Sequence, residues 1–389
     1  MDCVASRKRA ASEAYRVAVT ADPRFALAFA RLAQIEASYF AQFGRAPERL
    51  DSAQAHVNRA LALDPTLAEA HLAAGYVAYF GFFDYDRALL EFERVRQAQP
   101  NNGELLTILA TIQMHMGRWQ DARSSFLRAM RTAPRSPDAI APLAAIETML
   151  GHYDEAERLA DRELQLAPDY LAGHVQRSYS IILRGDTVGG RAALREAARK
   201  LGTTPVLIAL VHRFRNTLWY FDPALGDSLA TLRPGIAGMD SGSYYSARSQ
   251  VAWQRGDVRT RSAFADSARL IWEARIRRSP NEAKYHVELA HTYAALGRPD
   301  DARREADLAV TLLPVSKDAY LGTSILGEAA FVYAASGATD AAIDRFEQLL
   351  SHPAPISPQL LAIDSRLRAL HRNPRFQHLL KASLSSPAS

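Results

Sequence analysis

The chain has 389 residues, of which 48% are hydrophobic and 23% charged, and its formal net charge is +5. A single cysteine excludes a disulfide framework and a cysteine-rich metal site, and the apolar runs are far too short to cross a membrane. The first residues lack the apolar core of a signal peptide, so we expect a soluble, cytoplasmic protein.

The chain begins with residues that match only the second helix of a helix pair, which ends at Pro23. Because nothing upstream would cover its apolar side chains, we expect this chain to be cut from a longer protein. A complete pair follows and ends at Pro65, with an insert near Gly44–Asp51. The next pair ends at Pro100 and carries one extra residue, which we place in the turn Tyr79–Tyr85. We interpret this aromatic stretch as a tight turn packed under its neighbour, with ligand contact as the alternative.

The clearest pair spans Asn101–Pro134. Its first helix combines large apolar residues with a small one and ends at Gly117, where the backbone can turn. Small residues let the two helices approach closely, an aromatic residue fills the space beside them, and a proline ends the second helix. The pattern residues are Leu106, Leu109, Ala110, Ala122, Phe126, Ala129 and Pro134.

Two more regular pairs end at Pro168 and Gly202, and the pattern then blurs. There we expect a long apolar helix at 205–220 and an unusually long helix at 263–278, with a flexible joint in the Gly- and Ser-rich residues between them. The register returns at residue 280. The predicted divisions are an N-terminal stack (1–202), divergent repeats (203–279) with a joint near 234–243, a C-terminal stack (280–350), capping helices (351–381) and a disordered tail (382–389).

The recurring pattern resembles the tetratricopeptide repeat, a helix pair that stacks into a solenoid. In that family a large residue, a Leu and a Gly or Ala mark the first helix, and Ala, an aromatic residue, Ala and Pro mark the second. The resemblance implies an all-α, right-handed superhelical solenoid of about nine repeats.

A narrower resemblance is carried by phrases such as DYDRALLEFERV, GRWQDARSSFLRAM and LLAIDSRLRALHRNPRFQHLL. They are similar to the C-terminal repeat region of bacterial signalling proteins, in which it follows a serine/threonine kinase, an adenylate cyclase or a winged-helix DNA-binding domain. The catalytic motifs of such domains do not occur in this sequence. This resemblance implies a non-catalytic arm without cofactors, and with a kinase, cyclase or DNA-binding domain as its upstream partner.

One short segment of the chain superficially resembles the metal-binding motif of a zinc protease. His286 and His291 are five residues apart in HVELAH, whereas two zinc-binding histidines on a helix need a spacing of four. His286 also falls on a core position of its repeat. We therefore expect a packed histidine and no metal site.

The first helices of the repeats should line a groove in which a protein or peptide partner binds, and about half of their side chains should pack between repeats. In tetratricopeptide repeats the inner wall is formed by fixed positions of these helices, and here those positions are apolar, aromatic or uncharged. They are Leu72, Tyr76, Tyr79, Phe80, Thr107, Thr111, Met114, His115, Thr148, Met149, Val175, Tyr179 and Ile182.

The sequence thus favours a scaffold that binds a partner in this groove. The alternative is a regulatory sensor that binds a small hydrophobic ligand and changes curvature at the joint near 234–243. Nucleic acid is a less favoured partner, although basic residues are in excess at 200–280; these either serve an acidic partner or pair with neighbouring acidic groups. The arginines concerned are Arg213, Arg215, Arg248, Arg255, Arg259, Arg261, Arg275, Arg277 and Arg278.

Overall fold

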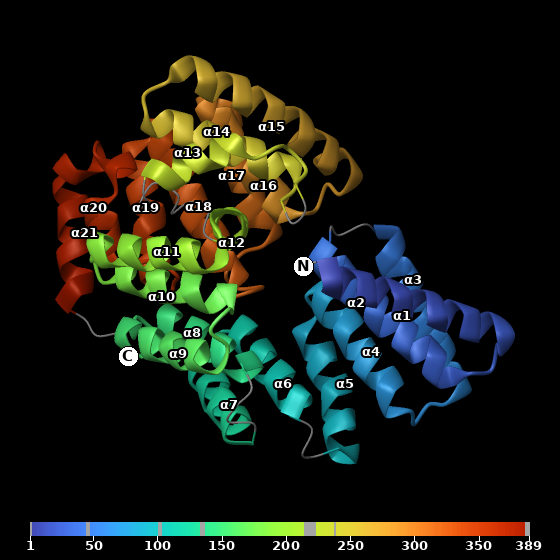
Figure 1. Cartoon of the computed structure of the whole chain (residues 1–389). Helices are drawn as coiled ribbons and strands as arrows, with labels where there is room; N and C mark the ends of the chain where they lie inside the picture. The colour runs from blue at the N-terminus through green and yellow to red at the C-terminus, as the bar shows by residue number, and fades with distance from the viewer. Residues whose placement is uncertain are drawn as a thin grey trace. The chain divides into compact units, whose positions relative to one another are not determined.

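A computed structural model describes residues 2–43, 47–99, 103–132, 137–213, 223–236 and 239–385. Within these ranges the regular secondary structure is helical, and Figure 1 shows the helices as consecutive antiparallel pairs. The chain divides into two compact units, Met1–Thr132 and Ala133–Ser389. The predicted all-α architecture of antiparallel helix pairs is confirmed.

The described residues of the first unit form seven α-helices and one π-helix. Its packed pairs are α2 with α3, α4 with α5, and α6 with α7, while α1 covers α2. The elements are α1 (Asp2–Ala21), α2 (Ala26–Phe43), α3 (Pro47–Leu63), α4 (Ala68–Tyr76), the π-helix η1 (Val77–Phe82), α5 (Tyr85–Ala98), α6 (Gly103–His115) and α7 (Trp119–Thr132).

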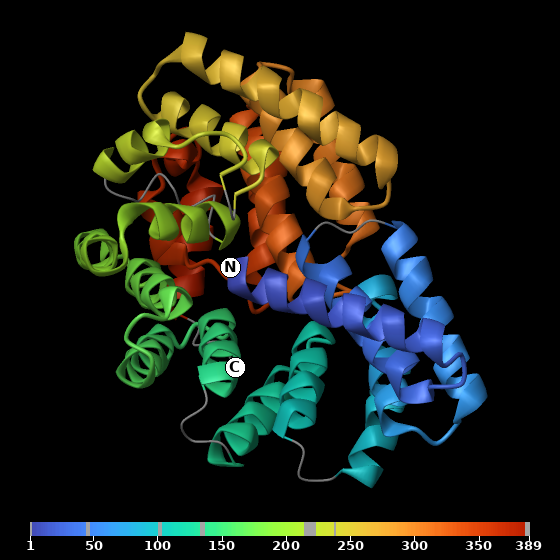
Figure 2. The same ribbon diagram turned by 45° about the vertical axis from the view of Figure 1, so that its right-hand side comes forward.

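The second unit continues the same arrangement and ends in short capping elements (Figure 2). Residues 382–385 belong to the last helix, and 386–389 of the predicted tail lie outside the described residues. The elements are α8 (Pro137–Met149), α9 (Tyr153–Leu166), α10 (Leu171–Leu183), α11 (Thr187–Leu201), α12 (Thr203–Arg213), α13 (Pro223–Thr231), α14 (Ser241–Gln254), α15 (Val258–Arg278), α16 (Ala283–Ala295), α17 (Pro299–Leu312), α18 (Leu321–Ala335), α19 (Thr339–Leu350), α20 (Pro358–Ile363), the 3-10 turns η3 (Ser365–Leu367) and η4 (Leu370–Arg372), and α21 (Pro374–Ser385).

Small residues at the helix contacts leave room for rings. Ala110 and Ala122 are fully buried where α6 meets α7, and Phe126 is fully buried beside them. In the pair α4–α5 the small residue is Gly75, and a Cβ at that position would lie 2.5 Å from the Phe92 ring. Close packing of the two helices therefore depends on the absence of that side-chain atom.

Histidines on the first helix of some pairs form hydrogen bonds to the end of the preceding pair. In three places the imidazole Nε2 bonds to the carbonyl oxygen of the proline six residues earlier, which requires Nε2 to carry the proton. Each contact satisfies a carbonyl at the junction between two pairs. These bonds are His71–Pro65 (2.9 Å), His174–Pro168 (2.9 Å) and His286–Pro280 (2.8 Å).

His286 is the packed histidine that its repeat position predicts, because it is only 3% exposed. Its Nδ1 lies 2.7 Å from the Glu305 carboxylate. Burial alone would lower the pKa of His286, but the bonds to Glu305 and to the Pro280 carbonyl, with the charge of Glu305, outweigh it and raise this pKa. His291 binds Glu328 of α18 at 2.6 Å instead of sharing a ligand with His286.

The helices of residues 203–279, where the repeat pattern is irregular, are also closely packed. The long second helix is present as α15, and the apolar helix predicted at 205–220 is α12 as far as Arg213, with 214–222 outside the described residues. Trp272 of α15 is fully buried against α14, and its Nε1 donates to Ser246 Oγ at 3.0 Å. A Cβ at Gly242 would lie 2.8 Å from this indole.

The C-terminal capping elements pack into the second unit. Leu367, Leu370 and Phe376 join the buried cluster around Trp272, whereas Leu360 of α20 joins the cluster formed by α10 to α14. In both views the red C-terminal elements lie beside the green pair α10–α11 (Figures 1 and 2). Residues far apart in sequence therefore share one core in this unit.

Candidate partner-binding site

The extra residue of the pair α4–α5 is taken up inside its first helix. Val77–Phe82 forms a π-helix, after which Phe83 adopts φ 53°, the left-handed conformation. Other pairs have a glycine at this helix end, as at Gly117 and Gly151. The prediction that the expansion lies in the turn is wrong in its position, because the wider helical turn absorbs it. π-Helical turns and left-handed non-glycine residues carry strain and are frequent at functional sites.

Aromatic side chains from η1 gather against α6. Tyr79 Oη and His115 Nε2 share a hydrogen bond of 2.9 Å, and both side chains are buried. The Tyr85 ring stacks on His115 with centroids 5.6 Å apart. Tyr76 stacks on Phe80 at 5.6 Å, so these rings form one continuous cluster. Tyr85 was absent from the predicted groove because its position belongs to the second helix of the pair.

The predicted groove residues of the first unit differ in their exposure to solvent. Leu72, Tyr76, Tyr79, Met114 and His115 are each less than 10% exposed, whereas Phe80, Thr107 and Thr111 are half-buried. The Thr111 hydroxyl donates to the Thr107 carbonyl at 2.9 Å, and that of Thr107 donates to Gly103 at 3.1 Å. Because both hydroxyls bond to their own helix, the half-buried surface is formed by a ring and two threonine side chains without charge.

The remaining groove residues lie in the second unit and are buried. Val175, Ile182 and Met149 are at most 3% exposed, and the Thr148 hydroxyl accepts a bond of 2.9 Å from Gln176 Nε2. The Tyr179 hydroxyl donates to the carbonyl oxygen of Pro355, which follows α19. Burial raises the pKa of Tyr179.

A non-helical segment after α19, residues 353–357, lies against α8 and α10. Ala354 N donates to the Met149 carbonyl at 3.1 Å, and Ser357 Oγ donates to the Leu183 carbonyl at 2.6 Å. The wall residues Met149 and Tyr179 therefore contact the chain itself. Three prolines in residues 351–360 were the sequence signal for an extended stretch, but they did not indicate where it would bind.

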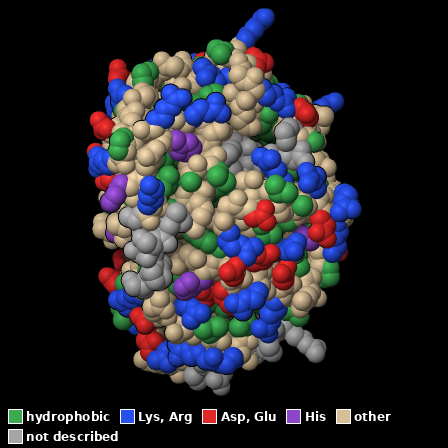
Figure 3. Space-filling model, turned by 90° about the vertical axis from the view of Figure 1, so that its left-hand side faces the viewer, with side chains coloured by type: hydrophobic (Ala, Val, Ile, Leu, Met, Phe, Trp, Pro, Cys, Tyr) green, Lys and Arg blue, Asp and Glu red, His purple; other side chains and the backbone are tan. Residues whose placement is uncertain are grey.

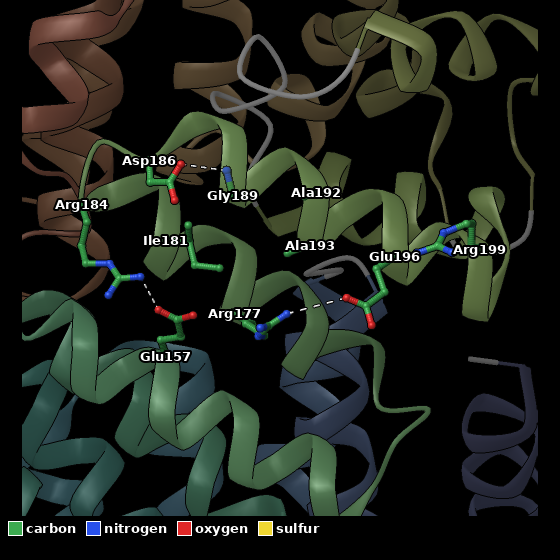
Figure 4. Close-up of a pocket in the computed structure, with 10 residues that line it drawn as sticks. All are labelled: Glu157, Arg177, Ile181, Arg184, Asp186, Gly189, Ala192, Ala193, Glu196 and Arg199. Carbon is green, nitrogen blue, oxygen red and sulfur yellow. Dashed lines mark hydrogen bonds and ion pairs between the residues drawn. The ribbon is translucent and has the colours of Figure 1, made fainter.

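A pocket of about 390 Å³ opens between α9, α10 and α11 (Figure 4). Arg184 binds Glu157 in this pocket, Arg177 lies 4.0 Å from Glu196, and Asp186 accepts from the backbone N–H of Gly189. Charges of both signs thus line the pocket and meet one another across it. This balance selects neither an anionic nor a cationic ligand.

Several arginines of residues 200–280 are engaged within the fold. Arg255 pairs with Asp227, and Arg275 pairs with Asp240 at 2.9 Å while stacking over an indole. The Arg248 guanidinium lies 4.3 Å above the Phe264 ring. The predicted pairing with neighbouring acidic groups is thus observed for Arg255 and Arg275, whereas Arg248 contacts an aromatic ring. The side chains of Arg213 and Arg215 lie outside the described residues. On the face drawn in Figure 3, basic and acidic side chains are interspersed.

The described residues contain no group of three or more His, Cys, Asp or Glu side chains placed to hold a metal ion. None of their helices combines the length and the apolar character needed to cross a membrane.

Comparison with known proteins identifies the repeat. Residues 105–140 match the family model described as tetratricopeptide repeat, and they include α7, most of α6 and the start of α8. This segment is a tetratricopeptide repeat. The same arrangement of two small residues and an aromatic one recurs in α4–α5 (Gly75, Ala88, Phe92) and in α18–α19 (Ala330, Ala342, Phe346), so these helix pairs have the tetratricopeptide-repeat fold.

One curated relative and two solved structures are similar over parts of the chain. The cellulose synthase operon protein C of Xanthomonas axonopodis pv. citri (strain 306) is 32% identical over 155 residues, which are 39% of this chain and 10% of the relative. YrrB, a tetratricopeptide-repeat protein with an unusual peptide-binding site, is 21% identical over 48% of this chain and 92% of its own, with a TM-score of 0.35. Pseudomonas aeruginosa pilF is 14% identical over 71% and 99% of the two chains, with a TM-score of 0.38.

Proposed function

We propose that this tetratricopeptide-repeat protein is a non-catalytic scaffold that binds a peptide segment of a partner protein on the first helices of its first unit. One observation carries the proposal: the strained π-helix and left-handed Phe83 hold an aromatic cluster at the wall of α4, η1 and α6. Strained backbone persists where a function or the surrounding packing maintains it. The proposal extends to a role as the interaction arm of a bacterial signalling protein.

The chemistry of this wall favours an uncharged or apolar segment. Phe80 provides a half-buried ring, and Thr107 and Thr111 lie on the neighbouring helix with hydroxyls already bonded to backbone carbonyls. An amphipathic or extended peptide would gain free energy chiefly by covering these side chains. Tyr76 and Tyr79, in contrast, support the wall from behind and are poor probes of binding, because truncating them removes core packing.

The test measures binding to the full chain. Peptides selected from a display library are titrated by calorimetry against wild type, Phe80→Ala and Thr111→Val. Loss of a half-buried anchor ring should weaken binding by about 1 to 3 kcal/mol, which is roughly five- to 150-fold. Thr111→Val keeps the shape of the wall and should change binding little.

The matched control is Val188→Ala, which truncates an apolar side chain that is 73% exposed in the second unit. It should leave the affinity unchanged. Equal affinity for wild type and Phe80→Ala, with both proteins folded by circular dichroism, would show that the partner binds elsewhere.

A further inference from the structure

The second unit holds a stretch of its own chain in the manner of a bound peptide. Residues 353–357 connect α19 to α20 without helical structure, and Ser357 has extended dihedrals (φ −119°, ψ 152°). Pro353, Pro355 and Pro358 fix their own φ and drive the residue before each of them to extended conformations, which lowers the entropy lost when such a segment is held. No charged residue occurs in residues 353–363.

The segment is recognised through its backbone and one hydroxyl. Ala354 N–H donates to Met149 O at 3.1 Å, and the Pro355 carbonyl accepts from the Tyr179 hydroxyl. Ser357 Oγ donates to Leu183 O at 2.6 Å and accepts from the Leu360 N–H at 3.0 Å, which also caps α20. The receptor groups thus come from the C-terminal ends of α8 and α10.

Aromatic side chains surround these polar contacts. Tyr153 at the start of α9 is half-buried, and burial raises its pKa to about 12 although a hydrogen bond to Ser357 acts in the opposite direction. Tyr153 packs against the hydrophobic cluster that contains Tyr179 and Leu360. Grooves lined by aromatic residues are one of the recurring ways in which proteins bind extended, proline-rich segments.

The residues of the segment differ in how deeply they are buried against the receptor elements. Ser357 is fully buried and Ala354 is 5% exposed, while the intervening Pro355 and Ile356 are half-buried. Leu360 then enters the cluster that contains Val175 and Ile182. Every third residue of the segment is therefore buried, namely Ala354, Ser357 and the apolar Leu360.

We propose that the ends of α8 and α10, with Tyr153 and Tyr179, form a binding site for an uncharged, extended, proline-rich peptide, and that residues 353–360 are its built-in ligand. A partner segment of the same chemistry binds there only by displacing them. This inference does not rest on the function proposed for the first unit, which concerns different residues.

The tether explains why wild type resists such a partner. A covalently linked segment competes at an effective concentration in the millimolar range, so a free peptide at micromolar concentration cannot replace it. Ala354→Pro removes the backbone donor to Met149, and Ser357→Ala removes the hydroxyl donor to Leu183. The double variant weakens the built-in ligand while every receptor side chain stays intact.

The experiment uses the full chain and a fluorescent peptide with the sequence of residues 352–363. We expect anisotropy to show no binding to wild type at micromolar peptide and clear binding to the double variant. Adding Tyr179→Phe should weaken that binding about fivefold, because the donor to the Pro355 carbonyl is lost. The matched control peptide carries the same two substitutions as the variant protein and should bind at least about fivefold less tightly.

Two results would overturn the proposal: a folded double variant that does not bind the peptide, or equal binding of the control peptide. Where the double variant does not fold, hydrogen exchange of Ser357→Ala in the full chain replaces it. Exchange should then accelerate in residues 353–361 and at the end of α10, but not in α16. Unchanged exchange in α10, or acceleration throughout the second unit, would show that the segment is a fixed part of the core.

Discussion

Replacing Gly242 with alanine tests how tightly α14 packs on α15. A Cβ at this position would lie 2.8, 3.0 and 3.1 Å from three atoms of the Trp272 indole. The indole has little freedom to withdraw, because it is fully buried, donates to Ser246 Oγ at 3.0 Å and lies 4.7 Å beneath the Arg275 guanidinium. The new methyl group must therefore displace a helix or the ring.

The magnitude follows from two opposing effects. Overpacking of a well-packed core costs about 1 to 3 kcal/mol, whereas alanine in place of glycine gains at most about 1 kcal/mol in a helix. The net loss of about 1 kcal/mol corresponds to a fall in melting temperature of about 2 to 4 °C for a unit of this size.

Thermal unfolding of the full chain, followed by far-ultraviolet circular dichroism, measures this change. In a Trp272→Leu background the alanine should no longer destabilise, because the six-membered ring that it meets is gone. Gly103→Ala is the control, since a Cβ there meets nothing within 4 Å. A higher melting temperature for Gly242→Ala, or the same loss in both backgrounds, would refute the packing argument.

Two other predictions concern backbone strain and pH. Phe83→Gly relieves a left-handed conformation that costs a bulky residue about 1 kcal/mol or more, so it should be more stable than Phe83→Ala in thermal melts; the reverse order would contradict this. The pKa of His286 is raised above its ordinary 6.5, so its bonds contribute stability that is fully present below that pH and is lost as pH rises through the folded pKa. The difference in unfolding free energy between wild type and His286→Gln should therefore shrink with rising pH, and a difference that grows would contradict the assignment.

The helix pairs could be predicted from the sequence because their determinants are local. Ala110, Ala122 and Phe126 stand at the spacing that the repeat pattern requires, and the two helices that this spacing predicts are α6 and α7. His286 was identified as a packed residue for the same reason. In each case the contact that buries the residue is made within one pair or with the next one along the chain.

Two features of the candidate sites were not predictable in this way. An added residue shows only that a pair is longer, and whether a turn or a helix accommodates it depends on the tertiary contacts of Tyr79 and His115. The contact between Tyr179 and Pro355 joins residues 176 positions apart, and such a contact leaves no periodic signal. The repeat positions therefore did not indicate that the chain itself would contact Met149 of α8 and Tyr179 of α10.

The π-helix also bears on how this pair can have gained its extra residue during evolution. An insertion within an α-helix rotates everything beyond it by about 100°, which would separate side chains that formerly packed together. Here the wide turn at Val77–Phe82 confines that rotation, so that Gly75 before it and Phe92 after it still meet. An insertion could thus be tolerated without simultaneous changes elsewhere. An alignment of the repeats should place its gap inside the helix, at the π-helical turn that contains Tyr79 and Phe80.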